Sequence, residues 1–465
     1  MLPDDVLLEI FNSHLYDKDN KIGSKREKAW QTLVHVCRRW RCIVFGSPRH
    51  LNLQLICTAT TPARDMLDIW PSLPLIVMFK FYRAYLIGSV DNLIAALECI
   101  DRVCQIYLDV VQSWDLDIFG AMQQSFPELT HLFLYSTDKM VAVVPDPFLG
   151  GSAPRLEVLS LYRISFPGLP NLLLSATHLV TLYLYNIPHF GYFSPDGLVV
   201  ALSTMTSLKH LSLGFQSPLS CPDPASRRPP PKTRSVLPVL TYLLFKGVSE
   251  YLDDLVACID APRLNELEII FFNDIELDTP QLARFISHTP KSKSLEKAYI
   301  TIQNCTAKVT FSSQSRRGLF TVEILCRGLD WQVSSLEQVC TSCLPPLFVL
   351  EDLYFHEDSD SQDWKDSVEN GQWLDLFRSF MAVKNLYLSE NFASRIAPSL
   401  QELVEGRATD VLPALQNIFL KGLESSGFVQ DSESIRKLVT ARQATNHPIV
   451  ISPWTDPEES EVEGD

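Results

Sequence analysis

The chain has 465 residues, 46% of them hydrophobic and 20% charged, and this balance predicts a folded globular protein and excludes disorder and collagen. The formal net charge is −15, from 40 basic and 55 acidic residues, which argues against nucleic acid or an anionic membrane as the main partner. The longest apolar run, residues 73–79, is much shorter than the roughly 18 residues of a membrane span, so no transmembrane helix is expected.

Two features of the chain predict an intracellular location, cytoplasmic or nuclear. The first residues carry a proline and two aspartates where a secretory signal would carry positive charge. The 11 cysteines are odd in number and lack the spacing of a disulfide framework, which favours a reducing compartment.

The N-terminal region predicts two helices. Pro3 suits a first helical position, the acidic residues after it favour the positive end of the helix dipole, and Leu7, Ile10 and Phe11 recur at helical spacing. A second helix is expected to end at residues 46–48. Its apolar stripe comprises Trp30, Leu33, Val34, Cys37, Trp40 and Val44.

The charge distribution separates this region from the rest of the chain. Residues 1–53 hold 9 Lys and Arg and 6 Asp and Glu, a net charge of +3, which leaves 31 against 49, or −18, for the remainder. Two segments with different roles are therefore predicted.

After residue 50 a short pattern recurs, apolar-x-x-apolar-x-apolar, succeeded each time by a helix-like stretch. Ten clear copies and three weaker ones occur in tandem at intervals of 23 to 33 residues, which is close to leucine-rich repeats but looser. The pattern predicts an α/β solenoid with one strand and one helix per repeat, and an irregular α/β domain is the alternative. The clear copies begin at Val103, Leu129, Leu156, Leu179, Leu208, Leu240, Leu264, Leu350, Val383 and Leu415, and the weaker ones at Leu73, Leu295 and Leu319.

These patterns also predict the domain boundaries. We expect a helical segment over residues 1–50, repeats over 51–452 and an acidic disordered tail over 453–465. Residues 217–238 are rich in proline and predict a surface insertion, with an SH3-type ligand as the less favoured alternative. Residues 356–370 predict an acidic loop.

Motifs that carry chemistry are weak. The calcium-loop template fits Asp358 and the acidic residues after it but has Asp363 where the sharp turn needs glycine, so a hydrated loop is the better interpretation. Cys340 and Cys343 form a C-x-x-C pair without further zinc ligands, which favours two core thiols. No catalytic or nucleotide-binding motif is found, so we expect neither an enzyme nor a cofactor or metal.

The N-terminal sequence LPDDVLLEIF, together with the later VHVCRRWRCIVFGSPRHLNL, resembles an F-box. The rest of the chain, including DWQVSSLEQVC, is similar to a fungal family of F-box proteins with degenerate leucine-rich repeats. The resemblance implies binding to a Skp-family adaptor and so to the cullin ligase core. The adaptor-binding residues that it implies are Leu2, Pro3, Leu7, Ile10, Phe11, Val36, Cys37 and Trp40.

The composition of this segment also favours a partner, because it holds two tryptophans and many aliphatic residues, more apolar surface than a small helical unit can cover by itself. A net positive charge suits an acidic adaptor. The alternative is that residues 1–53 only cap the first repeat.

Side chains alternate along a strand, so the third, fifth and seventh positions of each repeat are expected on the exposed face of the sheet. Nine of the 14 tyrosines fall on such positions. Tyrosine is enriched at protein interfaces, and its preference for strands is an equally good explanation. The predicted substrate-binding residues are Phe133, Tyr135, Tyr162, Tyr183, Tyr185 and Tyr242.

The expected function is a substrate-recognition subunit of a Skp-cullin-F-box type ubiquitin ligase. In this interpretation the helical segment binds the adaptor and the repeats bind a protein substrate. The alternative is a leucine-rich-repeat binding scaffold outside any ligase.

Overall fold

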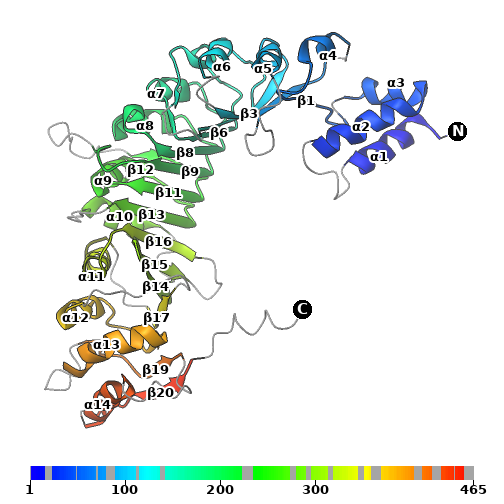
Figure 1. Ribbon diagram of the computed structural model, residues 1–465. Helices are drawn as coiled ribbons and strands as arrows, with labels where there is room; N and C mark the ends of the chain where they lie inside the picture. Colours follow the sequence, from blue (N-terminus) through cyan, green and yellow to red (C-terminus); the bar gives the residue numbers. More distant parts are fainter. Residues whose placement is uncertain are drawn as a thin grey trace. The chain divides into compact units, whose positions relative to one another are not determined.

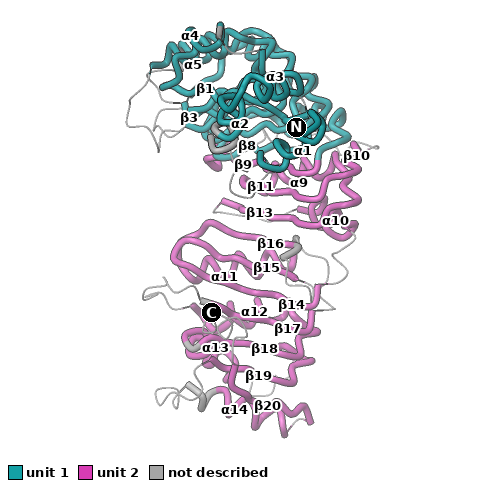
Figure 2. Tube along the Cα trace, turned by 90° about the vertical axis from the view of Figure 1, so that its right-hand side faces the viewer, with its two compact units in different colours: residues 1–208 teal, residues 209–465 magenta. Residues whose placement is uncertain are grey.

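The computed structural model describes residues 2–15, 24–48, 50–69, 72–79, 89–110, 115–136, 142–221, 234–272, 279–289, 295–312, 318–343, 350–357, 368–402, 411–421, 431–444 and 446–454. The chain forms two compact units, residues 1–208 and 209–465 (Figure 2). Each unit is described by itself.

The first unit begins with three helices, α1 (Asp4–Leu15), α2 (Ser24–Val36) and α3 (Arg38–Gly46). The prediction of a first helix is confirmed, whereas the prediction of a single second helix is wrong. The helix is interrupted at Cys37, whose backbone is extended (φ −160°). The Cys37 Sγ accepts a hydrogen bond from the Trp40 amide at the start of α3. A side chain that accepts from the amide three residues later caps the start of a new helix rather than continuing the one before it.

A parallel sheet comes next in the first unit, with helices packed on one of its faces (Figure 1). Its strands, in sheet order, are β1 (Leu55–Cys57), β2 (Leu75–Phe79), β3 (Val103–Val110), β4 (His131–Ser136), β6 (Val158–Tyr162) and β8 (Thr181–Ile187). Its α-helices are α4 (Ala63–Ile69), α5 (Val90–Leu97), α6 (Asp115–Ala121), α7 (Leu169–Leu173) and α8 (Pro195–Leu202). Two short 3₁₀ turns, η3 (Phe148–Gly151) and η4 (His189–Gly191), and a small sheet of β5 (Ala142–Val143) with β7 (Ile164–Ser165) complete the unit.

The second unit repeats this architecture. In sheet order its strands are β9 (His210–Phe215), β11 (Tyr242–Gly247), β13 (Glu266–Phe272), β16 (Gly318–Leu325), β15 (Thr306–Ser312), β14 (Lys297–Gln303), β17 (Asp352–Glu357), β18 (Asn385–Leu388), β19 (Asn417–Leu420) and β20 (Val450–Pro453). Its helices are α9 (Ser249–Cys258), α10 (Pro280–His288), α11 (Leu329–Gln338) with the π turn η7 (Val339–Cys343), α12 (Asn370–Arg378), α13 (Glu390–Glu402) and α14 (Asp431–Ala444).

The strand order of the second unit departs from simple repetition at β14, β15 and β16. Strand β15 is antiparallel to both of its neighbours, so the three strands form a meander. The meander is inserted so that β16 pairs with β13, and β14 pairs with β17. Sequence patterns missed β15, because the stretch between the repeats at Leu295 and Leu319 carries no copy of the leucine pattern.

The predicted strand register agrees with the described structure. Each of the 13 repeat copies carries a strand, and the leucines at pattern positions 4 and 6, such as Leu182 and Leu184, are buried. The tyrosines between them, such as Tyr183, are only partly covered. The expected mixed α/β fold with a large parallel sheet is therefore confirmed, while the F-box assignment and the boundary at residue 50 stay predictions.

Two segments expected to lack structure are partly ordered. Within the Pro-rich insertion, residues 222–233 lie outside the described part, but Ser235–Val236 form β10, which pairs with β12 (Ile259–Asp260), and Leu237 is buried. The expectation of a disordered tail from residue 453 onward is wrong for its first two residues. Pro453 belongs to β20, and Trp454 is buried. The Trp454 amide donates to the Leu420 carbonyl at 2.9 Å, and its indole packs on the rings of Tyr354 and Tyr387. Residues 455–465 lie outside the described part.

Candidate functional site

The helices α1–α3 form a small core of their own. Phe11 and Leu7 of α1 are buried, and the Phe11 ring lies 4.7 Å from that of Trp40 on α3. Trp30 of α2 is buried against Phe45, and its Nε1 donates to the Gln54 carbonyl at 3.2 Å. The last contact fixes the helices to the residues that lead into β1.

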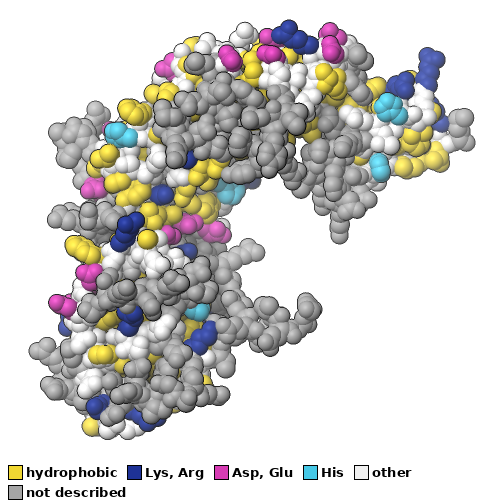
Figure 3. Space-filling model, viewed as in Figure 1, with side chains coloured by type: hydrophobic (Ala, Val, Ile, Leu, Met, Phe, Trp, Pro, Cys, Tyr) yellow, Lys and Arg dark blue, Asp and Glu magenta, His cyan; other side chains and the backbone are white. Residues whose placement is uncertain are grey.

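A stripe of apolar side chains on this segment faces solvent. Val6 and Ile10 are four residues apart and so share one side of α1, Leu2 lies just before this helix, and Val36 ends α2. All four side chains are between 39% and 56% exposed. Figure 3 shows hydrophobic side chains gathered along one side of the three-helix segment, with Lys and Arg side chains above them. We name Leu2, Val6, Ile10 and Val36 the apolar face.

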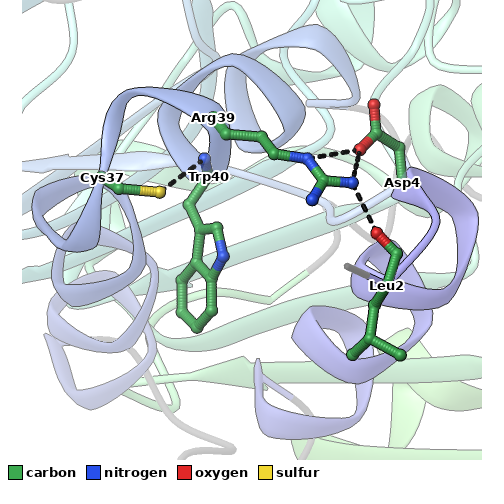
Figure 4. A network of polar contacts seen from close by, with 5 residues as sticks. All are labelled: Leu2, Asp4, Cys37, Arg39 and Trp40. Atoms are coloured by element: carbon green, nitrogen blue, oxygen red, sulfur yellow. Dashed lines mark hydrogen bonds and ion pairs between the residues drawn. The ribbon is translucent and has the colours of Figure 1, made fainter.

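Arg39 holds the beginning of α1 against the beginning of α3 (Figure 4). Its guanidinium donates from Nε and Nη2 to Asp4 Oδ1, at 2.9 and 2.6 Å, and from Nη2 to the Leu2 carbonyl at 2.5 Å. Because two N–H groups of Arg39 donate to the same carboxylate oxygen, the contact restrains the position of Asp4 relative to α3. Leu2 is thereby held near the junction of α2 and α3 that carries Cys37.

The structure separates the predicted adaptor-binding residues into two groups. Leu2, Pro3, Ile10, Val36 and Cys37 are exposed, and Trp40 is half-buried against Phe11. Leu7 and Phe11 instead are buried in the core beneath these residues, and their part in adaptor binding stays a prediction. Val6 was missed, although its spacing from Leu2 and Ile10 could have indicated it.

The exposed face of the first sheet carries a cluster of rings. Tyr107 and Phe133 stack at 4.6 Å, and Tyr135 and Tyr162 at 4.3 Å. Tyr185 lies 6.2 Å from Tyr162 and 5.6 Å from Tyr183, with all planes within 20° of parallel. Five of the six predicted substrate-binding residues are thus brought together, and Tyr107 joins them although it is not among the predicted site residues.

Tyr242, the sixth predicted residue, belongs to the second unit. Its hydroxyl donates to Glu268 Oε2 at 3.2 Å, and its ring lies 6.3 Å from that of His210. Tyr242 therefore has a carboxylate and an imidazole among its neighbours.

A longer row of rings in the second unit was not among the predicted site residues. Neighbouring rings lie 4.1 to 4.5 Å apart and within 12° of parallel. Burial raises the pKa of the central hydroxyl, that of Tyr354. The row comprises Tyr299, Tyr354, Tyr387 and Phe419.

Trp454 lies on this row. Its ring is tilted against those of Tyr354, Tyr387 and His356, at 6.0, 5.8 and 5.5 Å, and the residue is only 8% exposed. No sequence pattern indicates this contact, because an acidic stretch begins directly after Trp454 and the residue stands outside the repeats.

An amide ladder runs beside the ring row. Asn417 Nδ2 donates to Asn385 Oδ1 at 2.8 Å, and Asn385 Nδ2 donates to Asp352 Oδ1 at 2.6 Å. The ladder fixes these three strands in register, so the ring row is held on a rigid base.

Potential metal ligands are scattered in the described part of the chain. Among those residues, no group of three or more His, Cys, Asp or Glu side chains is arranged to hold a metal ion. The candidate calcium loop lies mostly outside the described residues; of the C-x-x-C pair, Cys340 is buried and the Cys343 side chain is not described. No helix in the described ranges combines the length and apolar character needed to cross a membrane.

No family model and no curated protein matches the chain. One similar solved structure is that of the leucine-rich repeat-containing protein LegL7 from Legionella pneumophila, at 14% identity and a TM-score of 0.27, covering 83% of this chain and 97% of that one.

Proposed function

We propose that this chain is the substrate-recognition subunit of a Skp-cullin-F-box type ubiquitin ligase. The observation that carries the proposal is that the apolar face, Leu2, Val6, Ile10 and Val36, is exposed to solvent. These residues lie in the segment whose sequence resembles an F-box. A contiguous apolar stripe on a small helical unit is typical of a protein-interaction site.

The chemistry of this face suits a helix of an acidic partner. An amphipathic helix can set its apolar side against the stripe, in the manner of helix-in-groove recognition. Arg38 and Arg41 are exposed near the same junction, and the segment carries a net charge of +3, so an acidic adaptor is also favoured by charge. Exposed Cys37 and half-buried Trp40 lie at the edge of such a contact.

The substrate side of the proposal rests on the ring-bearing faces of the two sheets. Tyrosine and phenylalanine provide large, stiff contact areas, and the rows are held by parallel strands in fixed register. In this proposal the chain supplies binding and positioning, and other subunits perform ubiquitin transfer.

The test is capture of this chain by an immobilised Skp-family adaptor. The double variant Val6→Glu, Ile10→Glu places two charges in the apolar face, and adaptor capture should be lost. Both side chains are exposed, so the melting temperature should stay within a few degrees of the parent. Val200→Glu, at an exposed position of α8, is the matched control and should bind as the parent does.

Capture of the double variant at parental strength would contradict the adaptor assignment. If the parent chain also fails to bind while partners still bind the sheets, the chain is a leucine-rich-repeat scaffold outside any ligase.

A further inference from the structure

The ring cluster of the first unit has a gap at Ser160. Strand register aligns Tyr107 with Phe133, Phe133 with Ser160, and Ser160 with Tyr183 on four successive strands. Three of these four residues carry aromatic rings, and the fourth, Ser160, does not. Ser160 is partly exposed.

The width of the gap matches one planar group. Neighbouring strands are about 4.8 Å apart, so Phe133 and Tyr183 are separated by two spacings, about 9.6 Å. Tyr107 and Phe133 stack at 4.6 Å, close to one strand spacing, so these rings stand with their faces toward the neighbouring strand. Tyr183 follows Ser160 on the next strand and is half-buried, with its ring 5.6 Å from that of Tyr185. A planar guest above Ser160 would therefore lie between Phe133 and Tyr183, with the face of Phe133 toward it.

The base of the gap is polar. Ser160 Oγ lies there, and no hydrogen bond joins it to another described residue. A phenyl guest would bury this hydroxyl without a partner, which is unfavourable. A guanidinium is equally flat, stacks on aromatic faces, and has N–H donors in its own plane that can reach the hydroxyl oxygen.

The charge of the surrounding face also favours a cation. The outward positions of β3, β4, β6 and β8 include one acid, Asp109, and neither lysine nor arginine. At these positions an approaching arginine would meet a carboxylate and no lysine or arginine. The outward positions are Gln105, Tyr107, Asp109, His131, Phe133, Tyr135, Val158, Ser160, Tyr162, Thr181, Tyr183 and Tyr185.

We propose that the first sheet binds a protein segment by taking one arginine side chain into the gap between Phe133 and Tyr183, above Ser160. The inference rests on the proposed function in one respect, that this face binds protein. It adds the chemistry of the partner: an extended segment with an arginine, whose guanidinium completes the row of rings.

The experiment uses the full chain and a positional-scanning library of fluorescein-labelled octapeptides, with binding measured by anisotropy. One position should select arginine. In the best peptide, replacing that arginine with citrulline, which is flat but neutral, or with phenylalanine should weaken binding about tenfold or more. Lysine, which lacks the planar group, should also bind more weakly.

Protein variants locate the site. Ser160→Tyr fills the gap with a ring and should abolish arginine selection, with the melting temperature unchanged or raised because the added ring stacks between two others. Ser160→Ala keeps the gap and removes the hydroxyl, so binding should weaken only partly. Thr301→Tyr, which adds a tyrosine to an outward position of β14, is the matched control and should bind as the parent does.

Several results would overturn the inference: no position selects arginine, citrulline binds as well as arginine, or Ser160→Tyr binds as the parent does. Adaptor capture is measured on the same preparations, because it depends on the apolar face alone. If arginine selection is absent while adaptor capture is intact, only this inference is wrong. If adaptor capture is absent while arginine selection is intact, only the ligase assignment is wrong.

Discussion

Leu182 and Tyr183 are adjacent in β8 but face opposite sides of the sheet, which permits a direct test of the register. Leu182 is fully buried, and its change to alanine removes three carbon groups, worth about 2.4 kcal/mol at about 0.8 kcal/mol each. The cavity left behind adds to this, so a loss of about 2.7 to 5 kcal/mol is expected. Tyr183→Ala loses mainly its contact with Tyr185, worth about 0.5 to 1.5 kcal/mol.

The assay is urea denaturation monitored by circular dichroism, with the shift in midpoint compared between the two variants. Leu182→Ala should shift the midpoint at least twice as far as Tyr183→Ala. If Tyr183→Ala is the more damaging change, the strand faces the opposite way, and every outward residue assigned by the same alternation is wrong.

Three further predictions concern other parts of the chain. Asp253→Ala should lower stability by about 1 to 2 kcal/mol in thermal unfolding, because Asp253 Oδ1 accepts two backbone N–H bonds at the start of α10; an unchanged melting temperature would show that the cap is dispensable. Trp454→Ala should lose about 3 kcal/mol and raise amide exchange in β20, and parental exchange rates there would contradict the packing described. Burial lowers the pKa of His131, so the unfolded chain binds a proton at this site more readily than the folded chain does, and stability falls as pH drops below the ordinary pKa of 6.5. His131→Gln should therefore narrow the difference in melting temperature between about pH 5 and about pH 7.5. A difference equal to that of the parent would refute the lowered pKa of His131.

The fold was predictable where one local pattern decides it. An apolar residue at positions 1, 4 and 6 forces the strand to bury that side, which is why Leu156, Leu159 and Leu161 occupy the core as expected. The meander was not predictable, because the placement of β15 depends on pairing with β14 and β16 rather than on its own sequence. The interruption of the helix at Cys37 was not predictable either, because the apolar residues keep helical spacing on both sides of it.

The candidate site was predictable only in part. Alternation placed Tyr162 and Tyr185 correctly on the outward face, but it could not show which rings touch. Helical spacing placed Phe11 and Ile10 on one stripe, yet only packing decides that Phe11 is buried and Ile10 is exposed. Trp454 depends on a contact between the end of the described chain and a strand about a hundred residues earlier, which no local pattern records.

The meander also determines which pieces of this protein can be removed or exchanged. In a simple array, one strand and its helix form a self-contained module, and deleting it lets the flanking modules meet. Here β13 meets β16 and β17 meets β14, so deleting β14 alone or β16 alone would leave a parallel strand facing an antiparallel one. Strands β14 and β16 run in the same direction, so removing β15 together with either of them, like removing all three, leaves a parallel edge on both sides. Shortened or recombined versions of the second unit should therefore lose β15 only together with β14, with β16 or with both, so an antiparallel pair of strands is the smallest piece that can be removed without reversing a neighbour.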